Sequence, residues 1–425
     1  MDKFDTKCVQ AGYNPSNGEP RVMPIVQSTT FAYDTPEEMG ELFDLKKAGY
    51  FYTRISNPTS EGLERKVAAL EGGTAAVTAA SGMSAITLTM LNILNAGDNF
   101  ISTATIYGGS FNLFNITLRR LGIDCRFVEN DTPAEEIEGL IDDKTRAIFM
   151  ETIANPAGIV ADFEKFSRIA EKYGILLIVD NTIATPALCR PIEFGANVVV
   201  HSSTKYLDGH ATSVGGIVVD GGNFDFKGNP RYPLFNEPDE SYHGIVFADA
   251  GKTAFGFRLR AVVNRDIGAI ISPFNAFLTN LGCETLHLRM PKHSSNALAL
   301  ARAMQKHPAV EWVKYASLEG DEDNARAKKY LSCGMASGMV SFGIKGGREA
   351  ASVFQKQLKL FRIATHVADA RSCVLHPAST THRQLTDAEL EKAGVPVNLV
   401  RLSVGIEDEQ DIIRDVTEAL NATLK

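Results

Sequence analysis

The stretch "VVVHSSTKYLDGH" (198–210) brings Lys205 into a cluster of small hydroxyl residues at the end of an apolar run. Burial close to an apolar strand disfavours the charged ammonium and lowers the pKa of a lysine, and such an amine suits Schiff-base chemistry. From this segment alone, a strand that ends in an exposed lysine is the simpler interpretation. The rest of the sequence therefore decides between the two.

Two other strand ends carry chemistry of a different kind. "ILLIVDNT" places Asp180 directly after five apolar residues, where an acid is costly unless it is paired. "TAASGM" ends in Gly82 and Met83 at the start of a predicted helix, and a glycine turn at a helix N-terminus suits a phosphate. Such turns are common, and the G-x-G-x-x-G fingerprint of a dinucleotide site is missing.

Together these strand ends offer an amine, an acid and an anion cradle, a combination that suits pyridoxal phosphate. Lys205 would form the Schiff base, and Asp180 would keep the pyridine nitrogen protonated. The phosphate would be held by four residues: Gly82, Met83, Ser202 and Thr204. Tyr107, after the strand "NFISTAT", could stack on the ring, although a plain loop tyrosine is the simpler interpretation of that residue alone.

Helices and strands alternate from about residue 60, and their strands are continuous apolar runs. This pattern predicts an α/β fold with a mainly parallel sheet covered on both faces, whose ligands lie at the carboxyl ends of the strands. We expect the first helix to begin at Ser60 as N-cap and to end at Gly72. A helical stretch near 265–305, later strands and a closing helix in "DEQDIIRDVTEALNATL" predict a smaller α+β domain.

We therefore expect three parts: an N-terminal arm (1–60), a cofactor-binding domain (61–258) and a C-terminal domain (259–425). The arm has weak periodicity and many turn residues, so it must pack on the body of the chain or on a neighbouring subunit. Residues 223–256 also lack periodicity, and we interpret them as a functional loop.

The composition excludes several classes of function. The 425 residues carry a formal net charge of −8 and no basic stripe, which disfavours nucleic-acid binding. The start lacks the apolar core of a signal peptide and no apolar run could span a bilayer, so the cytoplasm is the default location. No two of the six cysteines are closer than 40 residues, so no metal-ligand spacing is present.

Seven motifs, in this order and spacing, resemble the Cys/Met-metabolism family of pyridoxal-phosphate enzymes. They are "YTRISNPT" (52–59), "SGMSA" (81–85), "ETIANPAG" (151–158), "VDNTIATP" (179–186), "HSSTKYLDGH" (201–210), "HPASTTH" (376–382) and "VRLSVGIED" (400–408). The resemblance covers essentially the whole chain. It implies the fold-type I, aspartate-aminotransferase-like architecture with pyridoxal 5'-phosphate as cofactor.

The resemblance also implies a role for each matching residue. Lys205, Asp180 and the four phosphate-binding residues keep the roles given above. Tyr52 and Arg54 match a pair that reaches the phosphate of the adjacent subunit, so a homo-oligomer with shared active sites is implied, a tetramer built from dimers. Tyr107 would stack over the ring and help to move protons. Two further matches concern the substrate: Arg401, which would clamp its carboxylate, and Asn155, which would lie near the ring or that carboxylate.

Within the family, three features are similar to the O-acetylhomoserine sulfhydrylase branch: the long segment "RYPLFNEPDESYHGIVFADAGK", the form "HPASTTHRQL", and Gly109 in place of the cysteine typical of methionine γ-lyase. The implied reaction joins O-acetyl-L-homoserine to sulfide or methanethiol, giving L-homocysteine or methionine plus acetate. Methionine γ-lyase and cystathionine γ-synthase remain the alternatives, and the sulfur donor stays open.

The chain departs from this branch on one wall of the substrate site. His366 stands where the branch usually has asparagine, and "VADA" replaces the more usual Val-Gly-Asp. A neutral packing histidine and a substrate-binding histidine are both compatible with this position.

Overall fold

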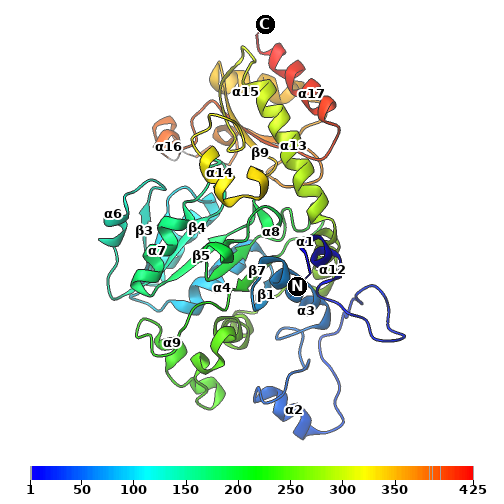
Figure 1. Cartoon of the computed structure of the whole chain (residues 1–425), viewed down its shortest axis with the longest axis vertical. Coiled ribbons are helices and arrows are strands. Elements are labelled where there is room, and N and C mark those ends of the chain that lie inside the picture. The colour runs from blue at the N-terminus through cyan, green and yellow to red at the C-terminus, as the bar shows by residue number, and fades with distance from the viewer. Residues whose placement is uncertain (1, 382, 385, 393, 425) are drawn as a thin grey trace.

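The computed structural model describes residues 2–381, 383–384, 386–392 and 394–424, with the side chains of all but 389, 391 and 392. Two β-sheets lie one above the other along the long axis of the molecule (Figure 1). The larger sheet has seven strands, and the smaller sheet, next to the C-terminus, has five. This is the α/β architecture with a second, smaller sheet that the sequence predicts.

The larger sheet has the strand order β1-β7-β6-β5-β4-β2-β3. Its strands are β1 (Ala75–Ala79), β2 (Asn99–Thr103), β3 (Asp124–Val128), β4 (Thr145–Glu151), β5 (Leu176–Asp180), β6 (Val198–His201) and β7 (Gly216–Asp220). β7 runs antiparallel to both of its neighbours, β1 and β6, and the other pairs are parallel. The mainly parallel sheet is therefore confirmed.

Successive residues of these apolar strands enter two separate cores, one on each face of the sheet. Ile148 lies in one core and Phe149 in the other, as the two-residue period of a strand requires. The first core contains residues of α3 (Pro58–Glu71), α7 (Phe163–Tyr173) and α8 (Thr185–Leu188). The second core contains residues of α4 (Gly82–Ile93), α10 (Ala254–Arg258) and the helical turn Leu259–Asn264.

Helix α3 begins earlier than the sequence analysis expects. Its N-cap is Asn57, whose side chain accepts a hydrogen bond of 2.9 Å from the Thr59 N–H, and Pro58 occupies the first helical position. Proline is preorganised for that position, so Asn57–Pro58 outcompetes Ser60 as the helix start. The Ser60 prediction was wrong. Gly72 does end the helix, in the left-handed conformation at φ 82°.

The smaller sheet has the strand order β10-β11-β12-β9-β8. Its strands are β8 (Val310–Lys314), β9 (Met339–Ile344), β10 (Arg362–Ile363), β11 (Cys373–Leu375) and β12 (Leu399–Ser403). The expected helical stretch near 265–305 consists of α11 (Arg265–Ile267), α12 (Pro273–Glu284) and α13 (Leu286–Met304). The other helices of this part are α14 (Asn324–Tyr330), α15 (Gly347–Gln357), α16 (Asp387–Lys392) and α17 (Glu409–Ala422), the expected closing helix.

The segment 223–256 covers the side of the larger sheet at which β4 and β5 begin. It contains the short helix α9 (Pro233–Asn236), 3-10 turns and a cluster of buried aromatic rings. Tyr232 accepts a hydrogen bond of 2.9 Å from the N–H of Leu176, the first residue of β5, and donates to the Arg146 carbonyl at the start of β4. The part around Tyr232 therefore packs over the starts of β4 and β5, and the functional role expected for the segment stays a prediction.

The N-terminal segment packs only in part on the rest of the chain. Helix α1 (Phe4–Gln10) lies on α3, where the Lys66 ammonium donates a hydrogen bond of 2.9 Å to the Cys8 carbonyl. Helix α2 (Pro36–Phe43) stands away from the body (Figure 1). The division into arm and two domains, with its exact boundaries, stays a prediction.

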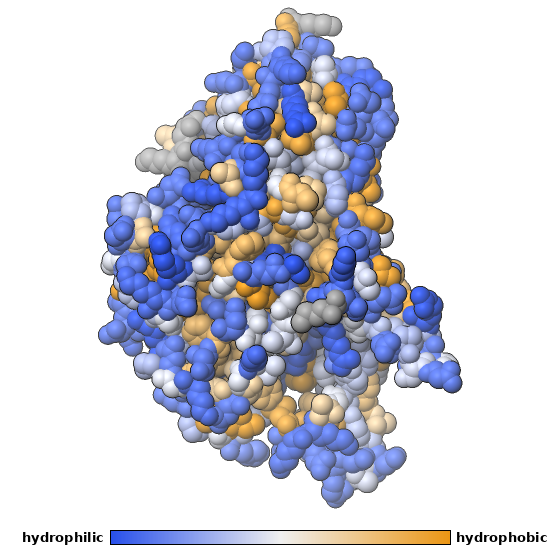
Figure 2. Space-filling view, viewed as in Figure 1, coloured by the Kyte–Doolittle hydropathy of each residue, from blue (hydrophilic) through white to orange (hydrophobic). Residues whose placement is uncertain are grey.

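Hydrophobic surface gathers in the middle of the face seen in Figure 2, whereas the rim is mostly hydrophilic. A cleft of about 480 Å³ lies between α1, α8 and α14, and another of about 520 Å³ lies between the N-terminal segment and α3. None of the predicted site residues lines either cleft. Among the described helices, none is both long and apolar enough to cross a bilayer.

Candidate active site

Three neighbouring strands of the larger sheet bring polar residues together at their carboxyl ends, which we call the carboxyl edge of the sheet. β4 ends in Glu151, β5 in Asp180 and β6 in His201. The register places Glu151 beside Asp180, and Asp180 beside Val200. Lys205 follows β6 by a single turn, so the sheet itself brings the predicted amine and the predicted acid to the same edge.

Among the described residues, Asp180 receives its hydrogen bonds on one oxygen. Its Oδ1 accepts from the Thr182 N–H at 2.9 Å and from the Thr182 hydroxyl at 2.5 Å. Desolvation raises the pKa of Asp180, while the Thr182 hydrogen bonds and then the charge of His201 oppose the rise. A carboxyl in this setting is stabilised as an anion by a cationic N–H donor, which is what a protonated pyridine nitrogen would provide.

Lys205 is largely buried between the two sheets. Desolvation lowers its pKa first, and the nearby positive charge of Arg401 lowers it further. Arg401 lies on β12 of the smaller sheet, so both sheets contribute to this part of the site. An amine with a lowered pKa is more often neutral and can act as a nucleophile or as a base.

The turn before α4 approaches β6 very closely. A Cβ atom added to Gly82 would lie 2.5 Å from the Ser202 Cβ, so only glycine permits this approach. Ser81 caps the helix by accepting a hydrogen bond from the Ser84 N–H at 3.1 Å. Gly82, Met83 and Ser202 thus meet at the N-terminus of a 12-residue helix, the expected setting for a phosphate.

Thr204 lies in the same turn but its hydroxyl is engaged with the backbone. It accepts from the Gly215 N–H at 3.1 Å and donates to the Gly215 carbonyl at 3.2 Å. Its role at a phosphate stays a prediction.

Tyr107 precedes the short helix α5 (Gly108–Asn112), and its side chain is 51% exposed. Its backbone N–H donates a hydrogen bond of 2.6 Å to Glu151 Oε1, which fixes the turn against the sheet edge. A Cβ atom at Gly109 would lie 2.5 Å from Cε1 of the Tyr107 ring. Gly109 therefore gives the ring the space that it occupies.

Arg401 and Asn155 meet where the two sheets face each other. The Arg401 guanidinium donates a hydrogen bond of 3.2 Å to Asn155 Oδ1, and burial lowers the pKa of Arg401 to about 10. The Ser341 hydroxyl on β9 donates to the Pro156 carbonyl at 2.8 Å, a second tie between the smaller sheet and this turn. Since Asn155 is the one hydrogen-bond partner of the Arg401 guanidinium among the described residues, the guanidinium retains donors for a ligand carboxylate.

The loop 366–373 forms the wall on which the chain departs from the sulfhydrylase branch. His366 Nε2 is buried without a hydrogen-bond partner among the described residues, and burial and then the charge of Lys205 lower the pKa of His366. Ala368 has φ 68°, and its N–H donates to Ser403 Oγ at 2.8 Å. The Cys373 thiol donates to the His366 carbonyl at 3.2 Å.

The motif "HPASTTH" begins at the end of β11. Its His376 is buried and hydrogen-bonds the Ser379 hydroxyl and the Val397 carbonyl, both at 2.8 Å. His382 and Leu385 of the longer form "HPASTTHRQL" lie outside the described residues.

Tyr52 and Arg54 are not brought to the Lys205 group within the single chain. The Arg54 guanidinium lies 5.2 Å from the centre of the Tyr52 ring and donates a hydrogen bond to the Arg265 carbonyl. Tyr52 pairs with Thr30 in an isolated antiparallel β-bridge. Their contacts are within the arm and with α11, so a phosphate role requires a second copy of the chain.

The sequence analysis missed two buried acidic residues at this edge. Glu151 is one, although it ends an apolar strand in the same way as Asp180, and that signal could have found it. Glu71 is the other. It lies 2.6 Å from His201 Nε2, with both side chains wholly buried, and it accepts a hydrogen bond of 2.8 Å from Asn181. Helical periodicity alone places Glu71 in α3 and gives no sign of this partner.

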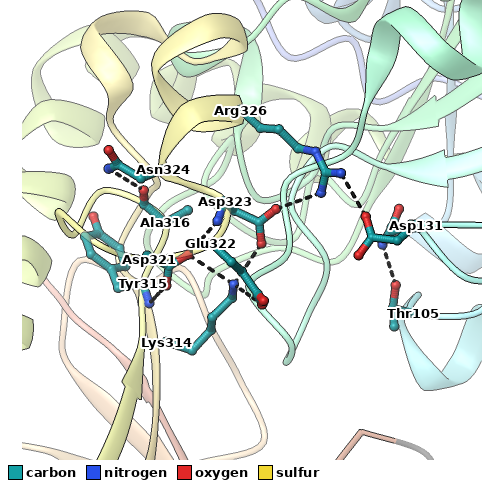
Figure 3. A network of polar contacts seen from close by, with 11 residues as sticks. Thr105, Asp131, Lys314, Tyr315, Ala316, Asp321, Glu322, Asp323, Asn324 and Arg326 are labelled. Carbon is teal, nitrogen blue, oxygen red and sulfur yellow. Dashed lines mark hydrogen bonds and ion pairs between the residues drawn. The ribbon is translucent and has the colours of Figure 1, made fainter.

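A network of ion pairs joins the smaller sheet to the turn before Tyr107 (Figure 3). Lys314 at the end of β8 lies 2.8 Å from Asp323, and Arg326 bridges Asp323 (3.0 Å) and Asp131 (2.8 Å). Next to Asp131, the Asn130 amide donates to Thr105 Oγ1 at 2.8 Å. The two sheets are therefore braced on the side of this turn.

This arrangement fits pyridoxal phosphate. A largely buried amine, an acid with one oxygen left free by the described residues and a glycine cradle at a helix N-terminus meet at the carboxyl ends of the strands, with an aromatic ring beside them. These are the groups that would carry the aldehyde, the pyridine nitrogen, the phosphate and the ring face.

Comparisons with known proteins agree with this chemistry. Residues 5–421 match the model of the family described as Cys/Met metabolism PLP-dependent enzyme. O-acetyl-L-homoserine sulfhydrylase of Leptospira meyeri is 44% identical, over 98% of this chain and 96% of that protein. Homocysteine synthase of Schizosaccharomyces pombe is also 44% identical, over 99% of this chain and 98% of that protein.

A solved structure shows the same fold. It is a putative O-acetylhomoserine (thiol)-lyase from Campylobacter jejuni with a TM-score of 0.96 and 37% identity, and the match covers 99% of this chain and 100% of that one. That protein carries N'-pyridoxyl-lysine-5'-monophosphate at its position 205.

Proposed function

Because this chain belongs to the Cys/Met-metabolism family of pyridoxal-phosphate-dependent enzymes, we propose that it replaces the γ-substituent of O-acetyl-L-homoserine with sulfur. Sulfide or methanethiol is the nucleophile, and the products are L-homocysteine or methionine plus acetate. One observation carries the proposal. Relatives named O-acetyl-L-homoserine sulfhydrylase and homocysteine synthase are 44% identical over almost the whole chain.

The residues at the sheet edge divide the work of holding the cofactor. Lys205 would carry it, Asp180 would take the pyridine N–H on its unoccupied oxygen, and Gly82, Met83, Ser202 and Thr204 would hold the phosphate. When bound, pyridoxal phosphate supplies an electron sink that stabilises negative charge on the substrate carbons.

The remaining residues act on the amino acid. Arg401 binds its carboxylate through paired charge-assisted hydrogen bonds, with Asn155 fixing the guanidinium. Lys205 Nζ, whose pKa burial lowers, takes the proton from the substrate Cα. Tyr107 covers the ring face and helps to move protons. Lys205 then takes a proton from Cβ, and the electron pair left there expels acetate from Cγ. A bond from Cγ to sulfur forms in its place, and protons return to Cβ and Cα.

The main alternative within the family is methionine γ-lyase, which breaks methionine down. Gly109 argues against it, since it stands in place of the cysteine typical of that branch and offers no thiol beside Tyr107. The test is the ratio kcat/KM for three substrate sets: O-acetyl-L-homoserine with sulfide, O-succinyl-L-homoserine with cysteine, and methionine alone. We expect the first to be largest. A largest value for methionine would identify a lyase, and a largest value for the succinyl ester with cysteine would identify a cystathionine γ-synthase.

We also propose that the chain works as a homo-oligomer with shared active sites, a tetramer built from dimers. Large apolar side chains are exposed on α12, on α13 and just before β7: Val214 (56%), Phe274 (55%), Leu281 (39%) and Leu288 (63%). Water-exposed apolar side chains in this number favour burial against a second copy. The exposed arm with Arg54 would then cross to the neighbouring site.

Mixing two inactive variants tests the shared site. Arg54→Ala and Lys205→Ala proteins should each be inactive or nearly so alone, and subunit exchange should produce hybrid dimers with one intact site. We expect activity to return to about a quarter of the wild-type value, because half of the dimers are hybrids with one working site. Proven exchange without recovered activity would mean that Arg54 serves its own chain.

The proposal includes a cytoplasmic location, which the six unpaired cysteine thiols favour. It also includes the three parts 1–60, 61–258 and 259–425, with the first part acting at the neighbouring subunit.

A further inference from the structure

We propose that Glu151 is a positioning residue that holds the Tyr107 turn and the Asn155–Arg401 contact in place beside Asp180. The inference rests on the proposed function, because it concerns the residues that bind the cofactor and the substrate there. Glu151 would touch neither of these molecules and would act through its neighbours.

The Glu151 side chain joins two separate loops. It is 7% exposed, and its Oε1 accepts the Tyr107 N–H at 2.6 Å, while its Oε2 accepts the Asn155 N–H at 3.3 Å. Tyr107 belongs to the loop after β2, and Asn155 to the loop after β4. One side chain therefore fixes the positions of both loops relative to the sheet edge.

The contact continues from Asn155 to the smaller sheet. Asn155 Oδ1 accepts the hydrogen bond of 3.2 Å from Arg401, so the backbone that Glu151 holds also carries the partner of the guanidinium. Arg401 and Tyr107 lie near each other. A shift of Glu151 would thus move the ring-covering residue and the carboxylate-binding residue together.

The residue type matches this task. A carboxylate presents two acceptors and no donor, whereas a glutamine in its place would turn its NH₂ group toward one of the two N–H groups. The position is otherwise unfavourable for an acid, since desolvation and the neighbouring Asp180 both raise the pKa of Glu151. Within the described part of the chain, Asp180 takes its hydrogen bonds on Oδ1. Glu151 instead has both oxygens occupied by backbone N–H groups. This difference separates a residue that binds a ligand from one that positions others.

The chain offers a matched control in Asp220, at the end of β7. Asp220 is 5% exposed, and its two oxygens accept the N–H groups of Gly222 and Gly256, each at 2.9 Å. It pairs with Val198 at the start of β6, whereas Lys205 follows the end of β6, so the two residues lie at opposite ends of that strand. Asp220→Asn makes the same chemical change in the same kind of setting, away from the site.

The experiment compares Glu151→Gln with Asp220→Asn in the cofactor-loaded enzyme. Three quantities are measured: the urea midpoint of unfolding, the visible circular dichroism of the bound cofactor, and KM and kcat for O-acetyl-L-homoserine. We expect both variants to lose stability. Only Glu151→Gln should change the circular dichroism band, because Tyr107 moves over the ring. It alone should raise KM about fivefold or more, with a smaller effect on kcat, since the Arg401 contact is loosened.

Equal circular dichroism and equal KM in the two variants would overturn the proposal and leave Glu151 a purely structural residue. If the wild-type enzyme does not turn over O-acetyl-L-homoserine, the proposed function fails, yet the circular dichroism comparison still decides the role of Glu151. If Glu151→Gln does not fold, Glu151→Asp replaces it, because the shorter carboxylate keeps both acceptors but cannot reach both loops. An unchanged dichroism band and KM in that variant would equally overturn the proposal.

Discussion

The two ends of the candidate site are built in different ways. At the cofactor end, neighbouring strands of one sheet fix Asp180 and the start of the Lys205 turn by register. At the substrate end, the wall 366–373 is a loop of the smaller sheet. His366 Nε2 in it has no hydrogen-bond partner among the described residues, and Ala368 has a left-handed backbone conformation. The cofactor end also matches the family motifs, whereas the loop departs from them.

This difference indicates which properties of the enzyme can vary independently. A residue fixed by strand register cannot move without disturbing the sheet, so the chemistry at Lys205 is tied to the fold. A loop tolerates substitution because few contacts depend on it. We therefore expect changes at the cofactor end to act on the chemical step, and changes at the wall to act on substrate binding or on stability.

Lys205→Ala should have the largest effect. Without the amine no proton can be taken from the substrate Cα, and we expect turnover to fall by about 10⁴-fold or more while the fold is retained. Turnover is measured together with borohydride labelling of the cofactor-bound lysine, with circular dichroism as the folding control. Near-normal turnover, or labelling of a different lysine, would remove Lys205 from the mechanism.

Arg401→Lys should affect substrate binding at one end of the site without affecting the cofactor at the other end. An ammonium cannot make the paired contact of a guanidinium, so KM for O-acetyl-L-homoserine should rise about 10- to 100-fold. The absorption spectrum of the bound cofactor should stay almost unchanged, because Arg401 belongs to the substrate end. A spectral change larger than the change in KM would contradict the separation.

His366→Ala should have a smaller effect, confined to the wall. His366 Nε2 has no partner among the described residues and is close enough to Lys205 to feel its charge, so its hydrogen-bonding capacity is available to a substrate. We expect KM to rise about threefold, the value of one neutral hydrogen bond, with kcat and the cofactor spectrum unchanged. An unchanged KM would identify His366 as a packing residue.

Ala368→Gly should affect stability alone. Ala368 has φ 68°, a conformation that costs an L-residue about 1–2 kcal/mol. Glycine avoids this cost, but it loses more conformational entropy on folding, so the net gain is smaller. We expect the free energy of unfolding to increase by about 0.5 kcal/mol, seen as a higher urea midpoint with kcat/KM unchanged. Ala350→Gly, within α15, is the opposite control and should destabilise the protein. A loss of stability in Ala368→Gly would show that the backbone is not strained there.

The sequence predicts the cofactor end well, because each signal there is local. A strand is recognised from its apolar run, and the polar residue that follows it must lie at the carboxyl edge, as Asp180 and Lys205 do. The same rule predicts that Glu151, which ends β4, lies at the carboxyl edge. The start of α3 was misplaced because Asn57–Pro58 is a stronger helix start than Ser60.

Contacts between distant segments could not be predicted in this way. The Glu71–His201 pair joins residues 130 positions apart, and the Arg401–Asn155 contact joins residues 246 positions apart. Neither pair leaves a periodic trace in the sequence. The packing within 223–256 was not predicted for a similar reason, since its turn-rich composition resembles that of a loop although Tyr232 hydrogen-bonds to the starts of β4 and β5.

The pairing of β1 with β7 has a consequence for the order in which the chain folds during synthesis. Ala75 pairs with Asp220, so β1 waits for a partner until 145 further residues have left the ribosome. At about 10 residues per second this is a delay of about 15 seconds, long compared with the folding of local helices. The Gly82 turn follows β1, and Ser202 follows β6, so the phosphate cradle is completed only near the end of that interval. Arg401 is made later still. The nascent chain thus has no complete cofactor site to offer until most of it has been translated.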